Sequence, residues 1–228
     1  MIVLSPHLDD GVLSLGATIA DAADRGGDVT VLTVFANDPE AGGGASAWDR
    51  ACGFTSAAEA ARARRSEDTL ACGLLGVRTE WLPFPGTDYR AGDPPATVWT
   101  DVERRIRDAD VVLAPGWPLR HPDHAWLAER VIAAPQGGRL GLYVEQPYAA
   151  DALLRHARRR PPRVPAASTS GAGIATWQAS RPGRGSRRAK QRAIGAYSSQ
   201  LGALGPMPRR RIAAYEALMR GEAIAWMG

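Results

Sequence analysis

MIVLSPHLDDGVLS, residues 1–14, decides the fold, because an apolar and β-branched run passes directly into a charged turn and then into a helical pattern. Residues 1–6 have the composition of a short buried strand. After Gly11 the apolar side chains recur at helical spacing from Val12 to Ile19, and two glycines then end the pattern. The stretch therefore predicts one strand followed at once by one helix.

The same alternation continues along the chain. Four more short apolar runs predict strands, and a helix between two of them is marked by Ser56 with Glu59 at its start and by Gly76 at its end. Such alternation indicates an α/β fold with a mostly parallel sheet and helices on both faces. The expected strands span residues 28–35, 77–84, 110–115 and 140–146, and the other expected helices span residues 96–108 and 122–134.

The pattern weakens in the C-terminal part. A proline-rich stretch, a Ser/Gly/Ala stretch and the run RPGRGSRR predict a basic loop, which two helices at 187–203 and 208–220 follow. We therefore expect an α/β catalytic core at 1–150, and a basic loop with helices at 151–228 that packs on this core within the same domain.

The composition limits the function classes. Cys52 and Cys72 cannot form a disulfide framework, which favours a reducing compartment. The N-terminus has no basic region before its apolar run, and no stretch approaches the ~20 apolar residues of a membrane-spanning helix. We therefore expect a cytoplasmic protein without a membrane span.

The charge is unevenly distributed. Residues 152–215 contain 14 Lys or Arg and no Asp or Glu, so the rest of this +4 chain carries −10. One interpretation is a solvated Arg-rich surface. The other is that Arg184, Arg187, Arg188 and Lys190 overhang the carboxyl end of the sheet and attract an anionic substrate.

The chemistry-bearing residues follow two of the predicted strands. His7, Asp9 and Asp10 come directly after the first strand, and His121 and His124 follow the fourth, three residues apart at the start of a helix. Doubly wound sheets bind ligands at the carboxyl ends of their strands. If the first and fourth strands are neighbours, the two groups of residues converge.

Two imidazoles and a carboxylate with an open position form a catalytic divalent metal site, and a spare carboxylate beside them suits a general base. Zn²⁺ is the expected metal, while Fe²⁺ and Co²⁺ fit the same ligands, which also form the facial triad of non-haem iron oxygenases. A structural alternative stays open, in which Asp9 or Asp10 caps the first helix and Asp123 caps its own.

The two motifs together resemble the signatures of the PIG-L/LmbE-like metal-dependent N-deacetylases, which are usually written PHPDDE and HPDH. Here they read SPHLDDGVLS and HPDH. The resemblance extends over most of the chain, through Arg64 and Glu67 with Ala71 and Leu75-Gly76, and through Lys190, Ile194 and Ser199-Gln200. It implies a Rossmann-like fold and substrates that carry N-acetylglucosamine on lipid, inositol, thiol-precursor or antibiotic scaffolds.

The resemblance also implies roles for individual residues. Asp9 corresponds to the general base that takes a proton from the metal-bound water, and His121 to the residue that stabilises the tetrahedral intermediate or protonates the leaving amine. Asp123 corresponds to a residue that holds a neighbouring histidine. The zinc ligands correspond to His7, Asp10 and His124.

Some positions depart from the family pattern or extend it. Leu8 replaces a proline, and Gly11 replaces the usual glutamate. The change at Gly11 removes a carboxylate beside the site, which affects substrate contacts or ligand orientation rather than metal binding. The resemblance makes Arg64 a candidate substrate contact. Trp117 precedes His121 by four residues and is expected to line the pocket, where an aromatic face suits a sugar ring.

These observations favour a zinc-dependent amide hydrolase. Its expected partner is a small-molecule N-acylated amino sugar or glycoside, with N-acetyl as the expected acyl group, and natural-product biosynthesis as one setting. An anionic substrate is compatible with the Arg-rich segment 155–192. The alternatives are a non-haem iron oxygenase and a basic nucleic-acid-binding module, and the second lacks any recognised nucleic-acid motif. The sequence does not indicate the oligomeric state.

Overall fold

The computed structural model describes residues 1–38, 40, 42–134, 137–156 and 176–227. Its centre is one seven-stranded sheet in the order β3-β2-β1-β4-β5-β7-β6. The strands are β1 (Ile2–Ser5), β2 (Thr30–Thr33), β3 (Arg78–Trp81), β4 (Val111–Trp117), β5 (Arg139–Val144), β6 (Trp177–Ser180) and β7 (Glu222–Trp226). Most of the expected basic loop lies outside the described residues.

The predicted sheet topology is confirmed where it matters for the site. β1 pairs in parallel with β2 on one side and with β4 on the other, and β5 continues the parallel sheet beside β4. The chain leaves β1 towards β2 and β3, then returns to β4, so β1 and β4 flank the switch point of the sheet. β7 runs antiparallel to both β5 and β6.

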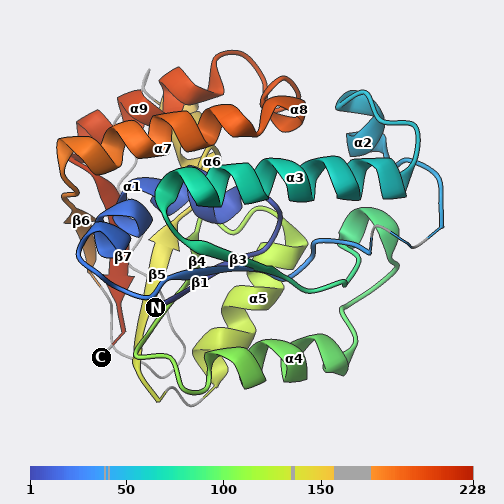
Figure 1. The fold of residues 1–228 in the computed structure, drawn as a ribbon, viewed down its shortest axis with the longest axis horizontal. Helices are drawn as coiled ribbons and strands as arrows, with labels where there is room; N and C mark the ends of the chain where they lie inside the picture. Colours follow the sequence, from blue (N-terminus) through green and yellow to red (C-terminus); the bar gives the residue numbers. More distant parts are fainter. Residues whose placement is uncertain (39, 41, 135–136, 157–175, 228) are drawn as a thin grey trace.

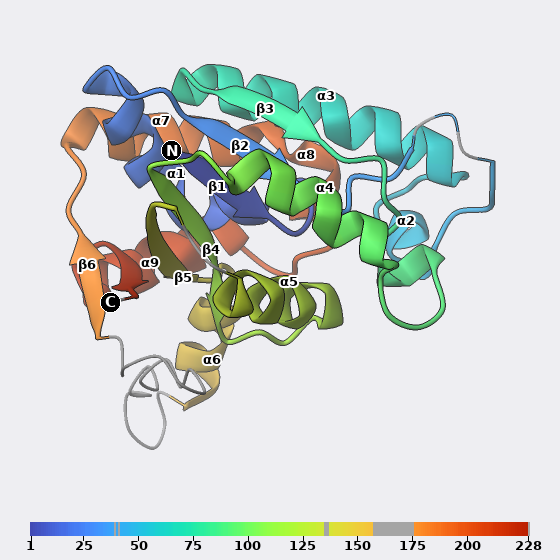
Figure 2. The same cartoon turned by 90° about the horizontal axis from the view of Figure 1, so that it is seen from below.

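Helices cover both faces of the sheet (Figures 1 and 2). One face packs against α1, α3 and α7 through apolar side chains such as Leu15 and Ala71, and the other face packs against α4 and α5 through Val102 and Leu127. These helices are α1 (Asp10–Asp24), α3 (Ala57–Leu75), α4 (Ala96–Ile106), α5 (Pro122–Ala133) and α7 (Arg184–Ala196). Among the described residues no helix is long and apolar enough to cross a membrane.

Local signals explain several boundaries. Ser56 caps α3 by accepting a hydrogen bond from the backbone of Glu59, and Gly76 ends the same helix with a left-handed φ of 73°. The first C-terminal helix begins at Arg184 rather than 187, so RGSRR forms its first turn instead of a loop. The expected helix 187–203 is divided, because α7 ends at Ala196 and the short helix α8 (Ser198–Leu201) follows. The elements that the sequence pattern did not reveal are β6, β7, α2 (Ala47–Ala51), η1 (Thr87–Tyr89) and α6 (Tyr148–His156). The last helix is α9 (Pro208–Met219), close to its expected 208–220.

The direction of α7 corrects the expectation for the basic cluster. Its first residues lie beside the end of α1, where the Gly183 backbone N–H donates to Asp21 at 3.2 Å. That end of α1 is about 20 Å from its start, given a rise of about 1.5 Å per residue. Arg184 therefore lies at the amino end of the sheet, away from the carboxyl end, and Lys190 is buried rather than exposed.

Candidate metal centre

The turn after β1 holds the first half of the site. Asp10 is the first residue of α1, and its Oδ2 accepts a hydrogen bond from the backbone N–H of His7 at 2.9 Å. Ser5 Oγ accepts from the backbone of Gly11 at 2.9 Å, which brings α1 close against β1. A Cβ on Gly11 would lie 3.3 Å from Cβ of Ser5, so a larger residue would require Ser5 to move. Glycine at position 11 thus fits this tight turn.

The second half comes from the loop after β4 and the start of α5. His121 caps α5, with Nδ1 accepting from the backbone N–H of Asp123 at 3.2 Å, and His124 lies fully buried in the first turn. Pro122 at the first helical position suits this start. The loop and the first turn of α5 thereby bring both histidines to the carboxyl end of β1.

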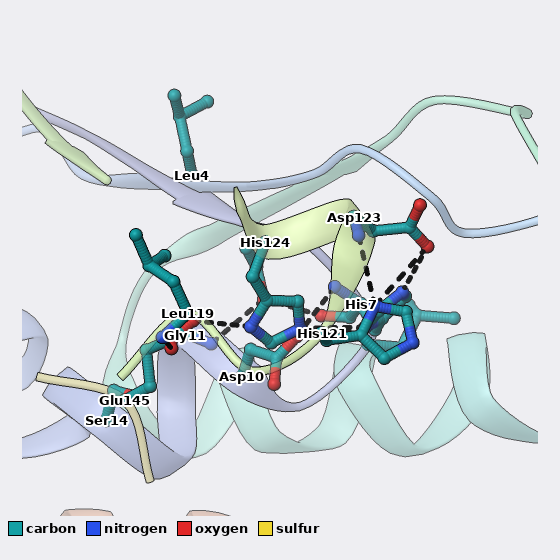
Figure 3. A network of polar contacts seen from close by, with 12 residues as sticks. Leu4, His7, Asp10, Gly11, Ser14, Leu119, His121, Asp123, His124 and Glu145 are labelled. Atoms are coloured by element: carbon teal, nitrogen blue, oxygen red, sulfur yellow. Dashed lines mark hydrogen bonds and ion pairs between the residues drawn. The ribbon is translucent and has the colours of Figure 1, made fainter. Parts of the chain in front are cut away.

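Three side-chain atoms from the two halves converge (Figure 3). Nε2 of His124 lies 3.2 Å from Nδ1 of His7 and 3.1 Å from Oδ2 of Asp10, and Nδ1 of His7 lies 3.3 Å from the same oxygen. Ligands about 2.0–2.2 Å from a tetrahedral zinc are about 3.3–3.6 Å apart, so these distances fit one divalent cation. His121 lies close enough that one ligand atom each of His7, His121 and His124 falls within 4.8 Å of the other two.

Each imidazole of this triad contacts a carboxylate through its other ring nitrogen. Oδ2 of Asp123 lies 3.0 Å from Nε2 of His7, and a Glu145 carboxylate oxygen contacts Nδ1 of His124. Sequence reasoning missed Glu145, although it directly follows the apolar strand β5 and so obeys the rule that identified Asp9 and Asp10.

The carboxylates strongly affect protonation. Burial opposes a charge on either imidazole, but the contacts with Asp10 and Asp123 outweigh it and raise the pKa of His7 to about 9. The contacts of His124 with Asp10 and Glu145 likewise raise the pKa of His124 to about 10. Burial also opposes the charge on Asp10, yet the two imidazoles hold its pKa well below the usual range. A bound divalent cation would replace the protons on the two converging imidazole nitrogens, Nδ1 of His7 and Nε2 of His124.

The carboxylate of Asp9 lies on the lining of the larger lobe. It occupies the N-cap position of α1 but makes no side-chain capping hydrogen bond, so the capping interpretation is wrong for this residue. It is 7% exposed, and burial, followed by the charge of Asp10, raises its pKa well above the ordinary value. A carboxylate with a raised pKa beside a metal-ligand triad is suited to accept a proton.

His121 is held in a neutral form. Burial and the neighbouring histidines lower its pKa to about 4. Because Nδ1 accepts the Asp123 backbone N–H, the ring proton resides on Nε2, where it can be donated to a ligand.

The site opens into a cleft with two lobes that share several lining residues. The smaller lobe, of ≈ 70 Å³, includes Arg64, and the larger, of ≈ 250 Å³, includes Asp9, Asp10 and Tyr148. The shared lining residues are His7, Trp48, Asp88, His121 and Gln200. His7 and His121 therefore lie where the two lobes meet, and Asp10 faces the larger lobe.

The aromatic wall of this cleft differs from the expectation. Trp48, on the short helix α2, lines both lobes. Trp117 instead packs against the cluster of Val144, Ala149 and Tyr215 and is absent from the lining of either lobe. The position of Trp48 could not be predicted, because α2 lies in a loop without a clear periodic pattern.

Arg64 lies at the smaller lobe, as a buried residue of α3. Its Nη1 forms an ion pair with Oδ1 of Asp49 at 2.9 Å, and its guanidinium lies over the ring of Phe54. Nε and Nη2 of Arg64 are buried and have no hydrogen-bond partner in the described structure. Two donors of this buried arginine are thus left without a partner beside the smaller lobe.

Comparisons with known proteins give consistent results. The family model for GlcNAc-PI de-N-acetylase (PIG-L) matches residues 2–135. The crystal structure of the A40926 pseudoaglycone deacetylase Dbv21 has a TM-score of 0.80 at 30% identity, over 99% of this chain and 95% of that one. A deacetylase of the teicoplanin biosynthesis pathway has a TM-score of 0.83 at 24% identity, over 100% and 97%.

The fold alone is shared more widely. The 4-carboxy-2-hydroxymuconate hydratase GalB of Pseudomonas putida has a TM-score of 0.61 at 19% identity, over 99% of this chain and 94% of that one. No curated protein matches the chain. Function must therefore be argued from the family and the site rather than from the fold.

Proposed function

The chain belongs to the GlcNAc-PI de-N-acetylase (PIG-L) family and is a deacetylase, and from this premise we propose that it removes the N-acyl group from an amino sugar on a glycosylated natural-product scaffold. The family assignment favours amide hydrolysis over an iron oxygenase and over a nucleic-acid-binding module. The observation that carries the proposal is the convergence of His7, Asp10 and His124 within 3.3 Å beside Asp9, whose carboxylate makes no capping hydrogen bond.

Zn²⁺ is the proposed metal, with His7, Asp10 and His124 as its ligands. Two imidazole nitrogens and one carboxylate oxygen are the donor set of catalytic zinc, and the fourth position is left for water or substrate. When bound, such a cation lowers the pKa of a water molecule and polarises a carbonyl oxygen. A related teicoplanin deacetylase was described in a zinc-inhibited form, so zinc is best added by titration rather than in excess.

Asp9 and His121 are the proposed catalytic residues. The Asp9 carboxylate accepts a proton from the water that attacks the amide carbon, because it is buried next to the triad and makes no competing hydrogen bond there. Nε2 of His121 donates its proton in a hydrogen bond to the oxygen that becomes negative in the tetrahedral state. Asp9 then returns this proton to the nitrogen of the breaking C–N bond, so that the products are a free amine and a carboxylate.

Substrate contacts are proposed for Arg64 and Trp48. The unpaired Nε and Nη2 of Arg64 supply donors for hydroxyl or carboxylate groups, and the indole of Trp48 supplies a face for a sugar ring. Trp117 packs against Val144 and Tyr215, so no substrate contact is proposed for it. The cytoplasm stays the proposed compartment because Cys52 and Cys72 are both unpaired.

The experiment compares acceptors of increasing size. Acetate and free amine are measured with N-acetylglucosamine, with a simple aryl N-acetylglucosaminide, and with an N-acetylglucosaminyl glycopeptide of the A40926 or teicoplanin type. Because remote contacts contribute to transition-state binding, kcat/KM should be at least about tenfold higher for the glycopeptide than for the free sugar. The Asp10→Ala variant is the control for contaminating activity.

Equal kcat/KM for all three acceptors would contradict the scaffold proposal while leaving the deacetylase assignment in place. Absence of acetate release from every acceptor would contradict both the acyl group and the acceptor class.

A further inference from the structure

Glu145 is a deeply buried acid at the site to which the proposed function assigns no role. It follows β5, is 1% exposed, and both its carboxylate oxygens are engaged (Figure 3). Oε1 contacts Nδ1 of His124, and Oε2 accepts the backbone N–H of Leu119 at 2.7 Å. Its own backbone N–H donates to the carbonyl of Trp117 at 2.7 Å. One side chain thus joins β5, α5 and the loop that carries His121.

The contact of Glu145 determines which nitrogen of His124 faces the triad. With Nδ1 engaged, Nε2 is left to face Asp10 at 3.1 Å. His7 has the opposite arrangement, because Asp123 engages its Nε2 and leaves Nδ1 for the triad. The two imidazoles therefore present different ring nitrogens, each set by its own carboxylate.

The two carboxylates differ in how their charge is shared. Asp123 also contacts the guanidinium of Arg90 and accepts from the backbone and hydroxyl of Thr87. Among the described residues, Glu145 has no Lys or Arg partner, and its other contact is a neutral N–H. Because the unshared charge lies in a buried environment, it acts more strongly on His124 than Asp123 acts on His7.

We propose that Glu145 is a positioning residue, which orients His124 and the adjoining loop for metal binding. The inference rests on the metal site proposed above and adds to it the group that holds its most buried ligand. In a glutamine at this position one of the two oxygens becomes an NH₂ group, so either Nδ1–H of His124 or N–H of Leu119 would face a donor instead of an acceptor.

The experiment measures zinc affinity of metal-depleted protein by chelator competition, for the wild type, Glu145→Gln, Asp123→Asn and Ser14→Ala. Ser14 is the matched control. Its Oγ accepts the backbone N–H of Gln146, the residue after Glu145, at 3.0 Å and contacts no histidine among the described residues. Glu145→Gln should weaken zinc binding by about 10–100-fold. Asp123→Asn should weaken it less, and Ser14→Ala should leave it within about twofold of the wild type.

A second measurement separates positioning from general loosening. In zinc-loaded wild type and Ser14→Ala, the Nδ1 proton of His124 should give a low-field NMR resonance, which should move upfield or disappear in Glu145→Gln. If Glu145→Gln does not fold, Glu145→Asp replaces it, since the shorter side chain keeps the charge but cannot reach both donors. Weakened zinc binding is again the expected result.

Unchanged zinc affinity in the Glu145 variant would overturn the inference while leaving the metal site intact. Equal loss in Glu145→Gln and Ser14→Ala would also overturn it, because the effect would then belong to the junction of β5 with α1. A wild-type protein that binds no zinc would overturn the metal site itself and the inference with it.

Discussion

Two buried clusters of charged residues in this protein differ in one respect that separates function from structure. At the carboxyl ends of β1 and β4, His7, Asp10 and His124 converge beside Asp9, whose carboxylate makes no capping hydrogen bond. Between α1, α7 and β7, Lys190 is 1% exposed and is paired with two glutamates. Burial of charge is common to both clusters.

The second cluster is closed. Nζ of Lys190 has three protons and meets three acceptors, namely the carbonyl of Ser14 at 3.1 Å, Oε1 of Glu222 at 2.6 Å, and Glu216. Glu222 also accepts from the backbone of Thr18 at 2.7 Å. A Cβ on Gly16 would lie 2.9 Å from Cγ of Lys190, so the helix is matched to this side chain.

The comparison teaches that incomplete pairing next to a cleft, rather than burial, identifies the functional cluster. The Lys190 cluster joins elements and leaves Lys190 no free donor. The triad brings two protonated nitrogens and one carboxylate oxygen within 3.3 Å of one another, and a divalent cation can take the place of the two protons. The predictions below test this distinction.

The largest effect is expected at Asp9. Asp9→Asn keeps the size of the side chain but removes the proton acceptor, so turnover should fall by about a hundredfold or more, the scale of general-base catalysis. Zinc content should stay at the wild-type level, because Asp9 is not a proposed ligand. Rate and metal stoichiometry are measured on the same sample, with Asp10→Asn as the variant expected to lose metal. Full turnover by Asp9→Asn would exclude it as the base.

Lys190 should affect stability instead of chemistry. Lys190→Met leaves Glu216 and Glu222 without their cation and should lower the free energy of unfolding by about 3–5 kcal/mol. Arg192→Met, an exposed change of the same kind on α7, should cost less than about 0.5 kcal/mol. Urea unfolding of both variants makes the comparison. A stable Lys190→Met with altered zinc affinity would show that the two clusters are not separate.

The pH dependence of zinc affinity tests the triad directly. In the metal-free protein the pKa values of His7 and His124 are raised to about 9 and about 10, so both imidazoles hold protons at neutral pH. Zinc must displace those protons, and its affinity should therefore rise by about tenfold to a hundredfold per pH unit between pH 6 and 8. Chelator competition at fixed ionic strength measures this slope. A flat profile would indicate ligands other than these histidines.

The smallest effect is expected for the exposed arginines of α7. Replacing Arg184, Arg187 and Arg188 by Gln should leave kcat/KM and its salt dependence unchanged within about twofold, because they lie in the first turns of α7, which begins beside Asp21 at the end of α1 that is remote from the site. Salt at 0.1 M, with a Debye length of ~10 Å, screens exposed charges at such a separation. Initial rates at 0.05 and 0.3 M salt test this. A flatter salt dependence in the variant would restore a role for them in substrate capture.

The sequence predicts the site better than its surroundings, for physical reasons. His7, Asp9 and Asp10 fall within four residues just after a strand, so their placement needs only the local pattern and the parallel sheet. The partners of Lys190 lie on α1, α9 and β7, and they meet only because α7 packs across α1. Such a cluster depends on tertiary contacts that no periodicity encodes.

The overturned expectations have the same origin. The charges of residues 184–188 are visible in the sequence, but the direction of α7 is set by its packing on α1 and α3, which places them at the other end of the sheet. Trp48 reaches the cleft from a five-residue helix within a long loop. Glu145 is the exception, because its position directly after β5 is visible in the sequence and predicts a place at the carboxyl end of the sheet.

The central claim is that one zinc ion at His7, Asp10 and His124 supports deacetylation. The most direct measurement titrates metal-depleted wild type with Zn²⁺ while free amine is released from an N-acetylglucosaminyl glycopeptide, with His124→Ala in parallel. The account predicts that activity of the wild type rises linearly to a break at one zinc per chain, and that His124→Ala neither binds this zinc nor gains activity. Full activity of metal-depleted wild type in the presence of chelator, or a wild-type response in His124→Ala, would contradict it.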